Sequence, residues 1–241
     1  MFDRVTIRTA DRALSERFYG ILLRTLGVEE TRTDARDARW RDFVIRQADD
    51  GAPPTRGLHV GFVAPARARV DEFWRVGTGE GFEDDGRPGA RPEYGPDYYG
   101  AFLRDPDGNS AEAVHHGDLR QDGVIDHLWI RVADVARAKA FYEAIGPHAG
   151  FALASEEEGR AQFKRDTGSF SVVDGTPTEN LHMAFAVAGH ASVEAFHAAV
   201  AEAGHRSVEE PAERWSDDGR AYAAAALDPD GNRVEVVHHG G

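Results

Sequence analysis

Histidine and carboxylate side chains that could bind a metal ion recur in this chain at a fixed spacing. His59 corresponds to His182 and Glu112 corresponds to Glu235, each pair being separated by 123 positions. The chain has no cysteine, so any metal site must use nitrogen and oxygen ligands. Imidazole and carboxylate groups of this kind suit divalent first-row ions.

The two copies differ at the position that decides whether a metal can bind. His127 in the second copy corresponds to Arg4 in the first. A guanidinium stays protonated and offers no lone pair to a metal, so Arg4 is not a ligand. One copy therefore has a histidine at a position where the other copy has a residue that cannot bind a metal.

The spacing extends over the whole chain and indicates a duplicated domain. Residues 3–19 align without a gap on residues 126–142, and the Asp-Pro-Asp-Gly-Asn segment at 105–109 recurs at 228–232. A period of this length is too long for a solenoid repeat. We therefore predict a domain over 1–117, a linker over 118–123 and a second domain over 124–241.

Composition restricts the class of protein and its partners. Apolar residues make up 41% of the chain, and no apolar run approaches the length of a membrane span. The N-terminus lacks the pattern of a secretory signal, so we expect a cytoplasmic protein without a membrane partner. The net charge of −14 repels phosphate backbones and argues against nucleic acid as a partner, while it attracts cationic small molecules.

The strand that carries His127 must place it on the face away from the helix that follows. Leu128 and Ile130 alternate with His127, Trp129 and Arg131, which is the period of a strand with one apolar face. If the apolar residues pack on the helix, His127 and Trp129 project from the opposite face.

The remaining elements repeat within each copy. Asp11 and Asp134 are suited to cap helices whose apolar residues recur at helical spacing, and each helix is followed by segments that predict three strands. The Asp-Pro-Asp-Gly-Asn segment has the residues of a tight turn, so we assign it no catalytic role. Each copy reads as two βαβββ modules, which gives four modules in the chain.

The chain resembles the vicinal oxygen chelate superfamily, which includes glyoxalases, bleomycin resistance proteins and extradiol dioxygenases. The resemblance rests on Asp126-His127-Leu128 with Phe141-Tyr142, on residues 181–185 and on residues 228–237. It implies an α+β fold in which four βαβββ modules form two cupped, incompletely closed mixed-sheet barrels with helices outside. It also implies a divalent metal in the cup that activates a chelating substrate.

The resemblance implies ligands on the first, fifth and last strands of the unit. Within the second domain this set is His127, His182 and Glu235. Relatives differ in which domain the first strand serves, and the cross-domain alternative is His127, His59 and Glu112. In the first case Arg4 could pair with Glu112, whereas in the second it lies beside His182 and Glu235. The resemblance implies one competent metal site per chain in either case.

A His-His-Glu set is a facial triad that suits Fe(II), Mn(II) or Zn(II) and leaves positions for substrate. The structural alternatives are that Glu112 and Glu235 pair with arginine and that His59 and His182 are hydrogen-bonded core residues. His116 and His239 share the parity of the glutamates, and we interpret them as histidines at strand ends.

Five residues are candidates for contact with a substrate. Arg91 and Arg214 occupy equivalent positions before the last hairpin, near Tyr98 and the candidates Tyr99 and Tyr222, and could hold an anionic or aromatic ligand. Trp129 could form a wall of the cavity or fill it. The alternative for the arginines is an ion pair that fixes a loop.

Three functions are compatible with these features. The leading hypothesis is a metal-dependent lyase or dioxygenase that acts on a small oxygenated molecule. Glyoxalase I itself is less expected, because the resemblance requires a further glutamate near the end of the fourth strand, where this chain has Val44-Ile45-Arg46-Gln47 and Ser171-Val172-Val173-Asp174. The alternatives are a metal-free protein that sequesters a cationic ligand, and a domain kept for assembly.

The fused pair also bears on the oligomeric state. Single-domain relatives dimerise to complete their cups, and the duplication can supply that interface within one chain. We expect a monomer with an internal pseudo-dimer and keep a homodimer as the alternative.

Overall fold

The computed structural model describes residues 1–166, 168–216 and 219–240. The first half contains β1 (Arg4–Thr9), α1 (Arg12–Thr25), β2 (Arg32–Thr33), β3 (Asp37–Trp40), β4 (Phe43–Gln47), β5 (Leu58–Val63), α2 (Arg67–Gly79), β6 (Glu83–Ala90), β7 (Tyr99–Arg104) and β8 (Ser110–His115). The second half contains β9 (Ile125–Val132), α3 (Val135–Ala149), β10 (Ala152–Glu157), β11 (Arg160–Arg165), β12 (Gly168–Asp174), β13 (His182–Ala186), α4 (His190–Glu202), β14 (Ser207–Ser216), β15 (Gly219–Leu227) and β16 (Arg233–His239).

The elements form four βαβββ modules, as the sequence predicts. In each module the first strand pairs in parallel with the last, and the two middle strands continue the sheet antiparallel. Modules then join through their first strands, so β1 pairs with β13 and β5 pairs with β9, both antiparallel. The α+β class and the two open, cupped mixed sheets are confirmed, since each eight-stranded sheet stays unclosed.

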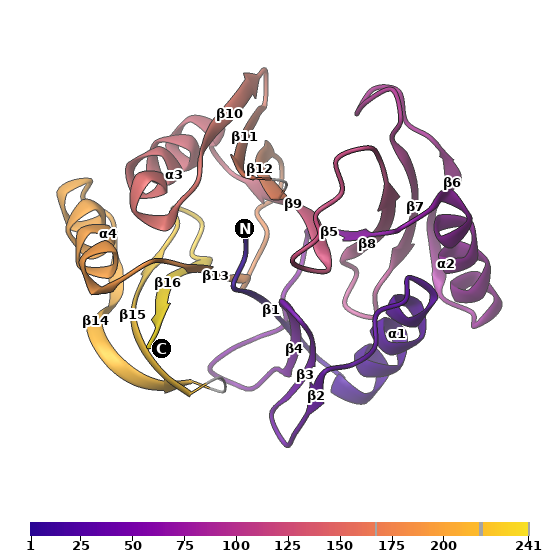
Figure 1. Ribbon diagram of the computed structural model, residues 1–241, viewed down its shortest axis with the longest axis horizontal. Coiled ribbons are helices and arrows are strands. Elements are labelled where there is room, and N and C mark those ends of the chain that lie inside the picture. Colours follow the sequence, from indigo (N-terminus) through magenta and orange to yellow (C-terminus); the bar gives the residue numbers. More distant parts are fainter. Residues whose placement is uncertain (167, 217–218, 241) are drawn as a thin grey trace.

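Each sheet combines one module from each half of the chain. One sheet has the order β14, β15, β16, β13, β1, β4, β3, β2, and the other has the order β10, β11, β12, β9, β5, β8, β7, β6. The helices instead pair within one half of the chain: α1 packs on α2, and α3 packs on α4. Figure 1 shows these two helix pairs on opposite sides of the molecule with strands between them.

The core follows from the alternation of the central strands and the apolar faces of the helices. Leu128 and Ile130 of β9 are fully buried, and so are Phe18 of α1 and Phe141 of α3. The buried apolar side chains form one main cluster that includes residues of both halves. Neither half therefore completes its cup or its core alone.

The predicted helix caps and the predicted tight turn are present at the expected residues. The side chain of Asp11 accepts a hydrogen bond from the Leu14 amide, and Asp134 accepts one from the Arg137 amide, so both predicted helix caps are confirmed. In the first Asp-Pro-Asp-Gly-Asn turn, Asp105 accepts hydrogen bonds from the Asn109 amide and the Tyr19 hydroxyl. The turn thereby holds α1 against the sheet.

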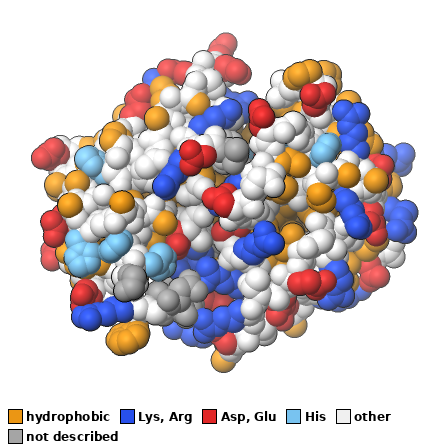
Figure 2. Space-filling view, in the orientation of Figure 1, with side chains coloured by type: hydrophobic (Ala, Val, Ile, Leu, Met, Phe, Trp, Pro, Cys, Tyr) orange, Lys and Arg blue, Asp and Glu red, His pale blue; other side chains and the backbone are white. Residues whose placement is uncertain are grey.

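None of the described helices has the length and apolar character that crossing a bilayer requires. Acidic and basic side chains are intermixed over the face shown in Figure 2.

The segment between the halves is anchored through a buried arginine. Arg120 is 2% exposed, and its Nη1 lies 2.5 Å from Oδ2 of Asp42 at the turn between β3 and β4. The other oxygen of Asp42 accepts a hydrogen bond from the Val124 amide, and Nη2 of Arg120 donates to the Phe2 carbonyl. This pair therefore fixes the segment before β9 against the other half of the chain.

We expect Arg120→Met to lower the free energy of unfolding by about 3–5 kcal/mol, because it leaves the Asp42 carboxylate buried without its partner. Urea unfolding followed by circular dichroism measures this loss. Arg69→Met is the matched control, since Arg69 pairs with Glu72 on an exposed helix surface and such pairs contribute about 0–1 kcal/mol. Equal effects of the two substitutions would contradict the anchoring role.

Candidate metal centre

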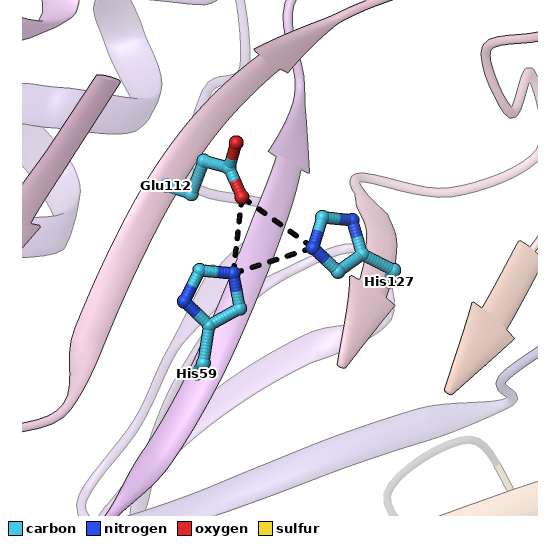
Figure 3. Close-up of side chains that lie close together, drawn as sticks. All are labelled: His59, Glu112 and His127. Atoms are coloured by element: carbon cyan, nitrogen blue, oxygen red, sulfur yellow. Dashed lines mark hydrogen bonds and ion pairs between the residues drawn. The ribbon is translucent and has the colours of Figure 1, made fainter. Parts of the chain in front are cut away.

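Three metal-ligating side chains meet where β5, β8 and β9 lie side by side. The Nε2 atom of His59 lies 3.0 Å from Oε2 of Glu112 and 3.3 Å from Nε2 of His127. The Nε2 atom of His127 lies 3.4 Å from the same glutamate oxygen. Figure 3 shows the three side chains pointing toward one another from three neighbouring strands.

The strand register explains this convergence. Gly61 of β5 is opposite His127 of β9 on one side and opposite Glu112 of β8 on the other. A Cβ atom on Gly61 would lie 2.4 Å from Cε1 of His127, so the imidazole occupies space that any other residue would fill. A second glycine, Gly100, makes room for Oε1 of Glu112 in the same way, at 2.3 Å.

The spacing of the three ligand atoms fits one face of an octahedral ion. Two adjacent ligands about 2.1 Å from a metal are separated by about 3.0 Å, which is close to the observed distances. The residues are buried, with Glu112 1% and His127 7% exposed. Among the described residues this is the group of three whose ligand atoms lie close enough together to share an ion.

A further layer of polar side chains orients the ligands. Asp126 accepts a hydrogen bond from Nδ1 of His127 at 2.9 Å, and its other oxygen lies 3.1 Å from Nε2 of His116. The Tyr98 hydroxyl donates to Oε1 of Glu112 at 2.8 Å, and the Tyr98 ring stacks on His116. With Nδ1 of His127 protonated, its Nε2 is available to a metal.

Burial and hydrogen bonding set the charges of the centre. Burial opposes the charge on His127, but hydrogen bonds to Asp126 and Glu112 outweigh it and raise the pKa to about 9. Burial lowers the pKa of His59. For Glu112, burial is outweighed by hydrogen bonds from His127 and His59, which lower its pKa. The metal-free centre thus holds a proton on His127 at neutral pH.

A cleft of about 730 Å³ opens beside His127. His127 and Asp126 lie in its lining, and Tyr94, Tyr98 and Trp129 form an aromatic wall. The Tyr94 and Trp129 rings meet edge to face with centroids 5.4 Å apart. The cleft is therefore a space in which a small molecule would reach His127.

The structure brings together the cross-domain ligand set and separates the within-domain set. His127 joins His59 and Glu112 because β9 pairs with β5. His182 and Glu235 lie in the other sheet, where Nε2 of His182 is 2.7 Å from Oε2 of Glu235. The set His127, His182 and Glu235 is corrected accordingly, since no single cup contains all three.

Arginines surround the second His-Glu pair. Arg4 faces Ala184 as His127 faces Gly61, and its Nη2 lies 3.7 Å from Oε2 of Glu235. Arg233 approaches the same oxygen to 3.6 Å. Burial of Glu235 is outweighed by His182 and these two arginines, which together lower its pKa to about 2. This second centre is a closed cluster of ion pairs.

Of the five residues expected to contact substrate, Trp129 lies in the cleft lining and the others point elsewhere. The Tyr99 hydroxyl donates to Asp71 of α2, and the Tyr222 hydroxyl donates to Glu194 of α4. Adjacent strand residues face opposite sides, so Tyr98 enters the cup while Tyr99 turns to the helix. Arg91 donates to the Arg87 carbonyl, and Arg214 pairs with Glu209.

Sequence reasoning missed the residues that support the ligands. The sequence-based hypotheses give Asp126 no role, name Tyr98 only as a neighbour of the residues that could hold a ligand, and interpret His116 as a histidine at a strand end. One signal was present in the sequence: Gly61 and Gly100 correspond to Ala184 and Ala223 in the repeat. Both glycines border the His-His-Glu centre, and both alanines fall on the side without it.

A family comparison matches the second half of the chain. Residues 124–236 match the sequence model described as Glyoxalase/Bleomycin resistance protein/Dioxygenase superfamily. A search of curated proteins finds no match.

Solved structures resemble either nearly the whole chain or about half of it. Glyoxalase I from Zea mays is 18% identical with a TM-score of 0.71, over 98% of this chain and 92% of the maize chain. A glyoxalase/bleomycin resistance protein from Albidiferax ferrireducens T118 is 28% identical with a TM-score of 0.43, over 47% of this chain and 98% of that chain. At these identities the likeness to the maize enzyme establishes the fold alone.

We expect Gly61→Ala to reduce metal affinity at least ~10-fold, because the new Cβ displaces the His127 ring. Isothermal titration with Zn(II) measures the affinity, and circular dichroism checks the fold. The matched control is the reverse change at the equivalent position, Ala184→Gly, which leaves affinity unchanged. Wild-type affinity in Gly61→Ala would refute the assigned position of His127.

Metal affinity is also expected to depend on pH through His127. Since its pKa is about 9 in the metal-free protein, a metal must displace its proton, and apparent affinity rises ~10-fold per pH unit up to about pH 9. The linked stability has the opposite sign: protonated His127 stabilises the metal-free fold fully below about pH 6.5, and this contribution is lost as pH rises through about 9. Zn(II) titrations between pH 6 and 9.5 test the first effect.

Asp126→Asn is the control for this pH dependence. It weakens the hydrogen bond that raises the pKa of His127, so the affinity should stop rising at a lower pH. An affinity that does not change with pH would exclude a proton on His127.

Proposed function

Because residues 124–236 match the sequence model of the glyoxalase/bleomycin resistance protein/dioxygenase superfamily, we propose that the chain is a metal-dependent enzyme with one active centre. His59, Glu112 and His127 would hold Fe(II), Mn(II) or Zn(II), and the substrate would be a small molecule that offers oxygen ligands. The observation that carries this proposal is the 3.0–3.4 Å spacing of the three buried ligand atoms.

The donor set fits a divalent ion in number, type and geometry. A bound ion supplies a Lewis acid that polarises an oxygen of the substrate. Three protein ligands on one face leave the other positions for small ligands, and the cleft beside His127 is where a substrate would enter.

The side chains around the ligands have defined tasks in this proposal. Asp126 keeps the proton of His127 on Nδ1, so that Nε2 remains a ligand. Tyr98 holds the second oxygen of Glu112 and favours binding through the first. Trp129 and Tyr94 form the apolar wall that limits water and orients the substrate.

The reaction class that we propose rests on the residues that β12 pairs with β9. Ser169 is paired with His127, and Ser171 is paired with Trp129, so β12 offers hydroxyl groups rather than a carboxylate at these two positions. This favours a lyase or dioxygenase that uses three protein ligands over glyoxalase I itself.

We further propose that the chain acts as a cytoplasmic monomer with an internal pseudo-dimer and a small-molecule partner. The pairing of β1 with β13 and of β5 with β9 supports the internal pseudo-dimer, because these contacts join the two copies within one chain.

A second candidate is metal-free binding of a cationic compound. Glu93, Asp97, Asp118 and Glu157 lie in the lining of the cleft and would attract a positive charge. In that case His127 and Glu112 would form a structural ion pair.

Elemental analysis of untagged protein purified without chelators separates the two candidates. We expect close to one equivalent of a first-row metal per chain, lost in His127→Ala and retained in His182→Ala. The second variant is the matched control, because His182 lies in the arginine-filled centre. No metal in the wild type, and none after titration with Fe(II), Mn(II) or Zn(II), would overturn the enzyme proposal.

A further inference from the structure

One wall of the cleft presents a row of polar side chains on β11. Arg160, Gln162 and Lys164 alternate with the buried residues Ala161 and Phe163, and all three line the cleft. The lining also contains the carboxylates Glu93, Asp97 and Asp118 from the first half of the chain, and Glu157 and Asp166, which flank β11. Arg160 and Lys164 are therefore the Lys and Arg side chains in a lining that otherwise carries negative charge.

Arg160 is held in place without being neutralised. Its Nε donates to Oγ of Ser171 at 3.1 Å, and its guanidinium lies over the Trp129 ring at 4.9 Å from the centroid. Across the described parts of the chain, no carboxylate forms an ion pair with Arg160 or Lys164. The N–H groups at Nη1 and Nη2 of Arg160 are therefore available to donate hydrogen bonds to a ligand.

Several arginines inside the fold contact carboxylates. Arg120 contacts Asp42, and both Arg4 and Arg233 contact Glu235. Carboxylates are plentiful in a chain with a net charge of −14, yet among the described residues Arg160 and Lys164 face the cleft without an ion pair. The Arg160 guanidinium is held by the hydrogen bond from Nε to Ser171 and by its contact with the Trp129 ring. Its remaining edge can therefore bind a planar carboxylate.

We propose that Arg160, assisted by Lys164, binds a carboxylate of the substrate; this proposal rests on the proposed function. Trp129 connects this subsite to the metal centre, since its ring contacts both the Arg160 guanidinium and the His59 ring. The substrate class is thus a small carboxylic acid whose oxygen ligands lie at the end remote from the carboxylate, with an apolar or aromatic body between them.

The test compares two chelators that differ in one charge. Zn(II)-loaded protein is titrated with 3,4-dihydroxybenzoate and with 3,4-dihydroxybenzamide by isothermal titration calorimetry. We expect the carboxylate to bind at least ~10-fold more tightly at low salt, because a charge-assisted bond replaces a neutral one. The zinc content is measured in the same samples.

Arg160→Gln should remove this preference while zinc content stays at the wild-type level. Arg160→Lys keeps the charge but not the two parallel donors, and should retain only part of the preference. Arg75→Gln on α2, away from the cleft lining, is the matched control and should behave as wild type. An equal affinity for both chelators in the wild type, or a preference that survives in Arg160→Gln, overturns the subsite.

Failure of the metal site is distinguishable from failure of this subsite. If the wild type binds no zinc, the proposed function fails, and the metal-free chain is titrated with benzoate and benzamide instead. A preference for benzoate that disappears in Arg160→Gln then still supports the subsite, and no preference overturns it.

Discussion

The antiparallel pairing of β5 with β9 is the constraint on which the candidate centre depends. It aligns Gly61 with His127 and thereby places an imidazole from one half of the chain beside His59 and Glu112 from the other. A shift by one residue would turn His127 toward the helices and Leu128 toward the cup. The packing of the apolar faces of both strands therefore fixes the positions of the polar side chains on the opposite face. The free energy of this packing maintains a site whose own contacts contribute little to stability.

The two centres show two solutions to the same physical problem, which is a buried glutamate. Glu112 is balanced by imidazoles that can exchange a proton for a metal, whereas Glu235 is balanced by His182 together with Arg4 and Arg233, whose charges are permanent. Leaving either carboxylate unpaired would be costly. The two sheets have equivalent strand orders, so the difference in chemistry comes from a few side chains and from two glycines.

Much of the fold could be predicted from sequence because its signals are local. The alternation around His127, the caps Asp11 and Asp134 and the repeated turn all act within a few residues. The choice between β5 and β13 as the partner of β9 could not be predicted from sequence, because both strands have the same alternation of residues and the same apolar face. Edge strands β6 and β14 were also hard to recognise, since each contains a proline, Pro88 and Pro211, which only an edge tolerates.

The separate encoding of the two first strands has an evolutionary consequence. In a symmetric homodimer whose subunits each contain one pair of modules, every substitution would appear in both cups at once. The loss of one metal ligand would then abolish both centres. Here residue 4 and residue 127 can change independently, although each still completes a cup built from both halves. Fusion thus releases the two cups from symmetry: one cup contains a self-neutralised cluster of ion pairs around Glu235, while the other keeps the three side chains that could share an ion.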